Sequence, residues 1–125
     1  MITSVKQLFT QEFLVDILTT ASYGSFWFEC SIHKDTPKEI INKAKEFECR
    51  EEKWACVLLN GGYVNIYDVE EEKNHKVSLE DIIRGFEIVM LNYPEIYASI
   101  RDESYDLYDA DAVIQCAVFG EVVYG

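Results

Sequence analysis

Residues 53–69, KWACVLLNGGYVNIYDV, decide the fold class of this chain. Two runs rich in apolar and aromatic residues flank Asn60-Gly61-Gly62, whose residue types tolerate the positive φ that a tight turn requires. The stretch therefore predicts a β-hairpin, with KWACVLL and YVNIYDV as antiparallel strands and the triplet as their turn. One face of each strand can then pack on a core, so we expect an antiparallel sheet.

The segments on either side of this hairpin extend the predicted sheet. Residues 26–32, FWFECSI, are rich in β-forming residues and predict another strand. Residues 75–77, HKV, follow an acidic turn and predict a short edge strand. We therefore expect an α+β fold with a small antiparallel sheet of about three to four strands, arranged as a hairpin and meander.

N-terminal, middle and C-terminal helices are predicted to pack with this sheet. Thr10 is an N-cap before residues 13–21, where apolar side chains recur at helical spacing. The sequence TPKE at residues 36–39 has the form of a capping box and predicts a helix that runs to about Glu48. Ser78 caps a further helix with an apolar stripe, and the proline at position 94 should end or kink that helix.

The stretch DADAVIQCAVFGEVVYG, residues 109–125, predicts a buried helix followed by a tail. Asp109 is a suitable N-cap, Asp111 lies in the first turn, where the helix dipole favours a carboxylate, and Gly120 is a suitable stop. Residues 112–119 are apolar on nearly all sides, as expected of a helix in a core. The two aspartates of this stretch are therefore interpreted mainly as residues that start the helix, by capping it or by interacting with its dipole.

The composition is that of one strongly acidic domain. The chain has 125 residues, 49% of them hydrophobic, and a formal net charge of -12. We expect a single domain over residues 1–125, because that length and apolar content suffice for one core. The negative charge disfavours direct nucleic-acid binding, which depends on basic side chains. Since no apolar run reaches the roughly 20 residues of a membrane span and no leader opens the sequence, we expect a cytoplasmic protein without membrane contact.

No residue pattern predicts catalysis, a metal or a cofactor. Cys30 and His33 could in principle form a nucleophilic pair, but on a strand their side chains face opposite sides. The sequence has no CxxC or HxxxH spacing for zinc, and Asp106, Asp109 and Asp111 lack the glycine and final glutamate of a calcium loop. We therefore predict a protein that is not an enzyme, and we expect its four cysteines to be reduced.

Three stretches of the chain carry a resemblance to a known family. They are TQEF with the later ASYGSFWF, then VSLEDIIRGFEIV, and finally DADAVIQCAVFGEVVYG, which is the most specific. Together they resemble a family of small, uncharacterised proteins of phages and integrative mobile elements of gut bacteria. Where that family often has an acid and two glycines before its aromatic pair, this chain has Ser22, Tyr23 and Gly24. The resemblance implies an accessory protein in a host bacterial cell, and such proteins often counter host defence.

We therefore expect a non-enzymatic anti-defence protein, with more than one mode of binding open. In the first, a pocket sequesters a small nucleotide-type signal of the host. It is formed by the aromatic turn at residues 23–28, by the hairpin face of Tyr63, Asn65 and Tyr67, and by the C-terminal tail. In the second, Glu70, Glu71, Glu72 and residues 102–111 bind a basic groove of a host defence protein, as a nucleic acid would. A third hypothesis is an oligomeric scaffold without ligand. An edge strand and aromatic faces favour a homo-oligomer, most simply a dimer.

Eight residues are candidates for the ligand site. Aromatic side chains could stack on a base, Gly24 could let a ligand approach the backbone, and Arg84 could pair with an anionic group. Because Glu121 stands between apolar residues, we expect its carboxylate to accept hydrogen bonds from Arg84 or from backbone N–H groups. The simpler alternatives are packing in the core for the aromatic turn and an ordinary solvated face for the hairpin. The candidates are Tyr23, Gly24, Trp27, Tyr63, Asn65, Tyr67, Arg84 and Glu121.

Overall fold

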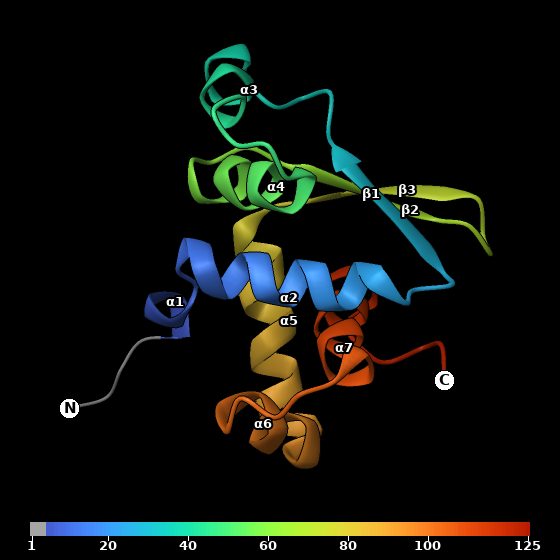
Figure 1. Cartoon of the computed structure of the whole chain (residues 1–125). Helices are drawn as coiled ribbons and strands as arrows, with labels where there is room; N and C mark the ends of the chain where they lie inside the picture. Colours follow the sequence, from blue (N-terminus) through green and yellow to red (C-terminus); the bar gives the residue numbers. More distant parts are fainter. Residues whose placement is uncertain (1–4) are drawn as a thin grey trace.

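The computed structural model describes residues 5–125, and this part of the chain forms seven helices and one three-stranded sheet. The helices are α1 (Val5–Leu8), α2 (Gln11–Tyr23), α3 (Lys38–Ala44), α4 (Arg50–Leu59), α5 (Leu79–Asn92), α6 (Pro94–Arg101) and α7 (Leu107–Phe119), and the strands are β1 (Phe28–Ile32), β2 (Val64–Asp68) and β3 (Lys73–Val77). The predicted α+β class is confirmed. In Figure 1 the sheet lies above α2 and α7, and α5 crosses α2.

The sheet has the order β1-β2-β3, and its central strand is antiparallel to both neighbours. Phe28 of β1 pairs with Asp68 of β2, although α3 and α4 lie between these strands in the sequence. β2 and β3 form a hairpin, in whose turn Glu72 occupies the left-handed region at φ 54°. The edge strand predicted at residues 75–77 is therefore confirmed, and it starts two residues earlier.

The hairpin predicted around Asn60-Gly61-Gly62 is wrong in its first half. Residues 53–59 lie in α4, whose side chains are buried over five consecutive positions. A short buried helix shows the same unbroken apolar run as a buried strand. Gly61 has φ 93°, and the N–H groups of the two glycines donate to the carbonyls of Leu58 and Val57. The triplet therefore ends a helix through a Schellman motif and does not turn a hairpin.

Two predicted caps are correct and mark the helices that frame the core. The hydroxyl of Thr10 accepts a hydrogen bond from the N–H of Phe13 at the start of α2. Ser78 and Asp81 form a capping box at the start of α5. As predicted, this helix ends just before Pro94, which is the first residue of α6.

Two other predicted caps are wrong. The Thr36 side chain does not cap α3; its hydroxyl donates to the carbonyl of Tyr63 at 2.9 Å and accepts from the Tyr63 N–H at 3.0 Å. α3 is also shorter than predicted, since it ends four residues before Glu48. α7 begins earlier than predicted, because Asp106 is its N-cap and Asp109 is the third residue of a capping box. A sequence pattern alone does not show that a hydroxyl is used elsewhere in the fold.

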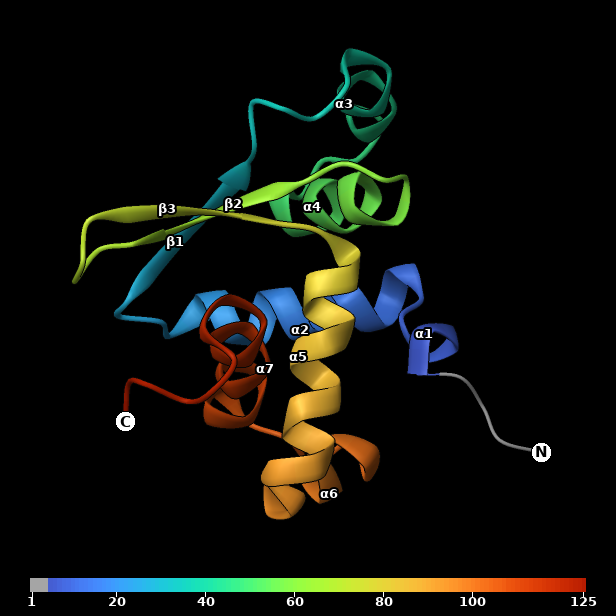
Figure 2. The same cartoon turned by 180° about the vertical axis from the view of Figure 1, so that it is seen from behind.

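The main hydrophobic core lies between one face of the sheet and the helices α2, α4, α5 and α7. Figure 2 shows α5 and α7 side by side from behind. Gly85 permits this contact, because a Cβ there would lie 2.6 Å from both the Val113 carbonyl oxygen and the Ala117 nitrogen. Among the described residues, no helix has the length and apolar character needed to cross a membrane.

Candidate functional site

Trp27, the central candidate of the aromatic turn, is a core residue with 0% exposure. Its ring stacks on Tyr124 of the C-terminal tail, with the centroids 5.4 Å apart, and Phe119 packs against it at 5.3 Å. The indole N–H donates to Asp111 Oδ1 at 2.7 Å. In this conformation Trp27 has no free face for a ligand, so the aromatic turn is filled by the chain's own tail.

Gln115 fastens that tail to α7. Its side chain is 1% exposed, and its Oε1 accepts hydrogen bonds from the N–H groups of Val123 and Tyr124, both at 2.8 Å. Its Nε2 donates to the Tyr124 carbonyl at 3.1 Å and to Asp111 Oδ2 at 2.6 Å. Asp111 is therefore a buried acceptor for two side chains. The interpretation of this acid as a first-turn residue that interacts with the helix dipole is wrong.

Two buried carboxyl groups hold the aromatic residues of this contact and differ in acidity: Asp111 accepts from Trp27, and Asp68 accepts from Tyr124. Burial raises the pKa of Asp111, and the hydrogen bonds from Trp27 and Gln115 only partly offset this effect. Burial also acts to raise the pKa of Asp68, but hydrogen bonds from Tyr124 and two backbone N–H groups outweigh it, so this pKa is lowered. The Tyr124 hydroxyl donates to Asp68 Oδ2 at 2.8 Å, and burial together with this bond raises the pKa of Tyr124 to about 12.

Arg84 and Glu121 do not form the predicted pair. Arg84 Nη2 donates to Asp81 Oδ1 at 2.6 Å, one turn away on α5. Glu121 is exposed, so the expectation that its carboxylate is drawn among apolar groups is wrong. Gly120, by contrast, has φ 79° and ends α7 as predicted. The tail is fixed by Gln115, and the left-handed glycine turns Glu121 toward solvent.

Tyr23 and Gly24 lie at the end of α2, beside the start of α7. Tyr23 is 91% exposed, and Tyr108 in the first turn of α7 is 68% exposed. A Cβ at Gly24 would lie 3.0 Å from Leu107 Cδ2. The close approach that this glycine permits is therefore taken by a side chain of the chain itself, while Tyr23 remains on the surface.

The three hairpin candidates alternate with Val64 and Ile66 as predicted, with Asn65 and Tyr67 in β2 and Tyr63 just before it. Tyr63, Asn65 and Tyr67 are half-buried and alternate with the buried side chains of Val64 and Ile66. Their strand therefore presents one face to the core and the other toward solvent.

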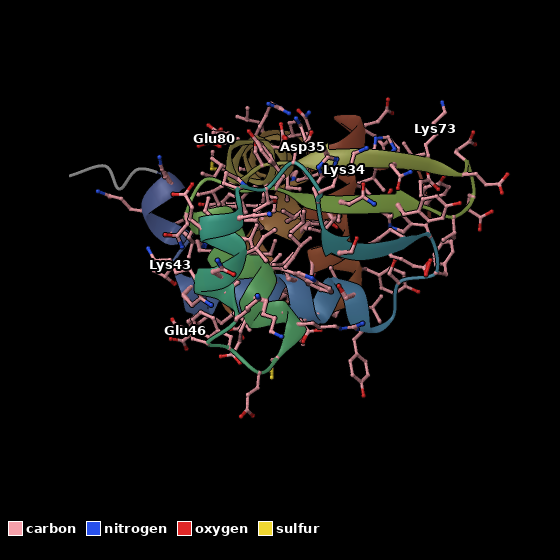
Figure 3. All side chains as sticks on the ribbon, turned by 90° about the horizontal axis from the view of Figure 1, so that it is seen from above. Lys34, Asp35, Lys43, Glu46, Lys73 and Glu80 are labelled. Carbon is pink, nitrogen blue, oxygen red and sulfur yellow. The ribbon has the colours of Figure 1, made fainter. Side chains whose placement is uncertain are left out.

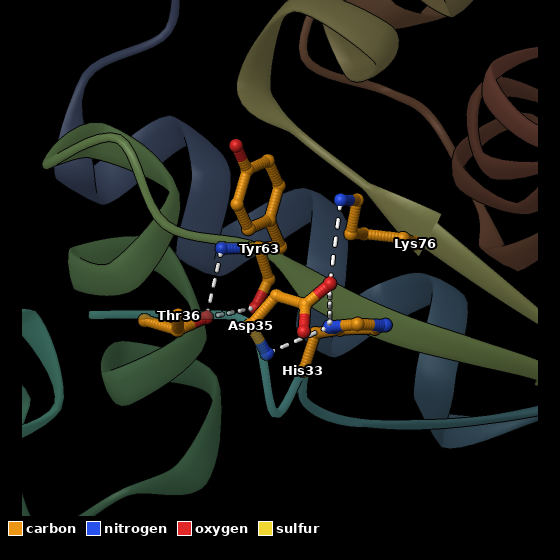
Figure 4. Close-up of polar contacts among 5 residues, drawn as sticks. All are labelled: His33, Asp35, Thr36, Tyr63 and Lys76. Atoms are coloured by element: carbon orange, nitrogen blue, oxygen red, sulfur yellow. Dashed lines mark hydrogen bonds and ion pairs between the residues drawn. The ribbon is translucent and has the colours of Figure 1, made fainter. Parts of the chain in front are cut away.

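Cross-strand contacts already engage much of this outer face. Asn65 Nδ2 donates to Asn74 Oδ1 at 2.8 Å. Lys76 Nζ lies 4.7 Å from the Tyr63 ring centroid and 3.4 Å from Asp35 Oδ2, as Figure 4 shows for the ion pair. These contacts describe a solvated sheet face whose polar groups bind one another.

Acidic charge is distributed unevenly along the chain. Residues 77–125, which we call the acidic segment, contain ten acidic residues and only two basic ones, Arg84 and Arg101. Both arginines are neutralised locally, by Asp81 and Asp102. Residues 1–76 contain 13 acidic and nine basic residues, a mixture visible in Figure 3, where labelled lysines lie among acids around α3 and the sheet. The charge excess therefore belongs mainly to α5, α6, α7 and their connections.

A cavity of about 530 Å³ lies where the acidic segment meets α2. Its lining comes from the start of α2, from α5 and α6, and from the connection between α6 and α7. Phe13, Phe86, Tyr97 and Tyr105 give it aromatic walls. No pattern in the sequence predicts this cavity, because its residues come from segments far apart in the chain.

The residues that fix the tail were also missed, although the sequence holds one signal. Within residues 110–119, ADAVIQCAVF, the strongly polar residues are Asp111 and Gln115, which are four residues apart and so lie on one face of a helix. A polar pair inside an apolar helix must find partners when it is buried. That rule points to a core network but not to Trp27 or Tyr124 as the partners.

Comparisons with protein-family models, with curated proteins and with solved structures found no match for this chain.

Proposed function

We propose that this chain is a non-catalytic binding protein that contacts a basic surface of a host defence protein through its acidic segment, in the cytoplasm of a bacterium that carries a phage or mobile element. The observation that carries this proposal is the concentration of ten acids, nine of them outside the core, against two paired arginines in residues 77–125. Charge of one sign on one side of a molecule steers a partner of opposite charge and favours one orientation.

The surface of the acidic segment has the mixed character of a protein interface. Glu87, Glu95 and Asp102 are exposed, and they share this segment with Leu91 and Tyr108, which are 76% and 68% exposed. Exposed apolar and aromatic side chains supply contact area, while the surrounding charges select the partner. The other acidic candidate is the turn between β2 and β3 with Glu70, Glu71 and Glu72, which we call the hairpin tip. It lies far from α6 in both views of the molecule (Figures 1 and 2).

Two further observations support binding rather than chemistry or nucleotide capture. Burial raises the pKa of the Cys30 thiol well above its usual range, which disfavours a nucleophilic thiolate. The aromatic turn that was expected to receive a base is occupied by Tyr124, and Arg84 is already paired with Asp81. The four free cysteines fit a reducing compartment.

The test is capture of a defence protein, followed by binding measurements with the purified pair. The first variant, Glu87→Gln with Glu95→Gln and Asp102→Asn, removes three charges from the acidic segment and replaces no residue that lines the cavity or fixes the tail. The matched variant, Glu70→Gln with Glu71→Gln and Glu72→Gln, removes three charges from the hairpin tip. We expect the first variant to slow association and the second to have little effect, with association falling steeply as salt increases.

Three outcomes would overturn the proposal. Binding that is insensitive to salt would exclude an electrostatic interface. Loss of binding in the hairpin-tip variant alone would move the interface to the β2–β3 turn. A nucleotide released by heating the purified protein would favour sequestration of a host signal instead.

A homodimer remains a prediction beside this proposal. Exposed apolar side chains such as Leu91 could be covered by a second copy as well as by a partner. Light scattering over a range of concentrations distinguishes the two, because a dimer doubles the mass of 14.5 kDa and a monomer keeps it at every concentration.

A further inference from the structure

The cavity between α2, α5 and α6 combines two features that attract organic cations. Its floor is aromatic: the half-buried rings of Phe13 and Tyr97 pack edge to face on the buried Phe86 ring, with centroids 6.3 and 5.9 Å away. The faces of such rings carry negative charge and attract cations placed over them. Because Phe86 is buried while Tyr97 and Tyr105 are half-buried, the rings form walls that open toward solvent.

Three carboxylates surround the opening of this cavity. Glu12, Asp16 and Glu103 line it and are exposed, and no ion pair joins any of the three to another residue within 5–125. Asp16 and Glu103 come from α2 and from the α6–α7 connection, yet both lie near the same tyrosine. Burial raises the pKa of Tyr105, and the charges of Asp16 and Glu103 raise it further.

The chain itself shows the kind of contact that the walls can make. The guanidinium carbon of Arg101, the one basic residue of the lining, lies 5.8 Å from the Tyr97 ring centroid. Its Nε is 3.4 Å from Asp102, so the charge of this arginine is partly compensated outside the cavity. The three carboxylates of the opening therefore keep an excess of negative charge over the aromatic floor.

We propose that this cavity binds the guanidinium group of an arginine side chain presented by the partner protein. A guanidinium is planar, stacks on aromatic rings and forms two parallel hydrogen bonds with a carboxylate, so it matches both the walls and the opening. An anionic group would be repelled by the same carboxylates. This inference rests on the proposed function, since it assigns the pocket between the acidic segment and α2 to one arginine side chain of the basic partner.

The test measures binding of the single side chain before any partner is known. N-acetyl-arginine amide is titrated into the protein, and N-acetyl-citrulline amide, which has nearly the same shape without the charge, serves as the control ligand. We expect NMR signals of Phe13 and Tyr105 to shift with arginine, at an affinity at least about tenfold above that for citrulline. Equal binding of both ligands, or shifts elsewhere in the chain only, would overturn the proposal.

A matched pair of variants locates the site. Glu103 and Glu72 are the two non-glycine residues with positive φ among those described, at 58° and 54°. Asparagine tolerates this region better than glutamate, so Glu103→Asn and Glu72→Asn should both raise the urea midpoint. Only Glu103→Asn removes a carboxylate from the cavity, and it should weaken arginine binding several-fold while Glu72→Asn leaves it unchanged. Equal arginine binding by the two folded variants would overturn the assignment.

The two proposals can fail separately. Arginine binding in the cavity without salt-dependent capture of a defence protein would support the pocket and contradict the proposed function. Capture that survives Glu103→Asn, by a protein that binds arginine and citrulline amides equally, would support the function and contradict the pocket.

Discussion

The tail contact and the cavity bring carboxylates and aromatic rings together in opposite ways. Around Trp27, the carboxylate of Asp111 is buried and bonded to two neutral donors, and the tail closes over the ring. Around Phe86, three carboxylates surround rings that face an opening, without an ion pair among residues 5–125. Carboxylates and aromatic rings therefore stabilise the fold where they bond to each other, as around Trp27. At the cavity the carboxylates have no ion-pair partner among residues 5–125, and there we propose that they bind a ligand.

The largest expected effect is the loss of the Trp27 side chain. Trp27→Ala should lower the free energy of unfolding by about 3–5 kcal/mol, because a fully buried aromatic side chain leaves a cavity. The nearby Tyr23→Ala should change it by no more than about 0.5 kcal/mol, because Tyr23 is 91% exposed. Urea unfolding of both variants measures the difference. Similar losses of unfolding free energy in the two variants would contradict the placement of Trp27 in the core and Tyr23 on the surface.

The next effect concerns the connection between α7 and the tail. Gln115→Leu should cost about 1–3 kcal/mol, because it leaves buried groups of Asp111 and the tail without their partners. Hydrogen exchange at the N–H groups of Val123 and Tyr124 should accelerate.

Glu121→Gln is the control for that experiment. It changes an exposed side chain in the same tail, so it should shift stability by only a few tenths of a kcal/mol. A large loss in this variant would restore the buried role that the sequence suggested for Glu121.

A smaller effect of opposite sign is expected at the cavity. Glu103→Asn should raise the free energy of unfolding by about 1 kcal/mol, because the left-handed backbone at φ 58° is strained for glutamate. Stability and arginine binding then move in opposite directions, which is the behaviour of a binding residue rather than of a core residue. A variant that loses stability would show that Glu103 makes a structural contact.

The smallest expected effect is a difference in pH dependence between the carboxyl groups of Asp111 and Asp68, which bond to Trp27 and Tyr124. Because the pKa of Asp111 is raised, its contribution to stability falls as the pH rises from the unfolded value through the folded one. Because the pKa of Asp68 is lowered, its contribution is present above the unfolded value and is lost as the pH falls through the folded one.

Asparagine variants at the two positions measure this difference. Relative to the unchanged protein, Asp111→Asn should be more stable at about pH 7 than at about pH 3, and Asp68→Asn should show the reverse. The readout is the urea midpoint of each variant minus that of the parent at both pH values. Differences of the same sign at the two positions would contradict the assignment of their pKa shifts.

Local signals in the sequence predict the parts of the fold that depend on local contacts. The caps at Thr10 and Ser78 and the stop at Gly120 are recognisable because each uses a residue type that the backbone at that point requires. Residues 53–59 are ambiguous, because the six-residue apolar run at 54–59 fits a buried strand as well as a buried helix. The Asn-Gly-Gly triplet after that run permits positive φ, which Gly61 adopts, and both interpretations use such a residue, so the triplet could not decide between them.

The sites depend on contacts between distant parts of the chain, and little of them could be predicted. Trp27 and Asp111 are 84 positions apart, and Asp68 and Tyr124 are 56 apart. No pattern in one segment shows that its side chain will meet a given residue of another. For the cavity, the composition indicated an acidic surface, but the aromatic floor required the packing of α2 against α5.

The tail contact also constrains how the protein is made. Trp27 is synthesised long before Asp111 and Tyr124. A nascent chain therefore carries an indole whose hydrogen-bond acceptor has not yet been made. Until residues 111–124 emerge, neither the Asp111 carboxylate nor the Tyr124 ring can cover the Trp27 side chain. A chain that ends before Gln115 should therefore be degraded faster in the cell than a chain that includes residues 111–124.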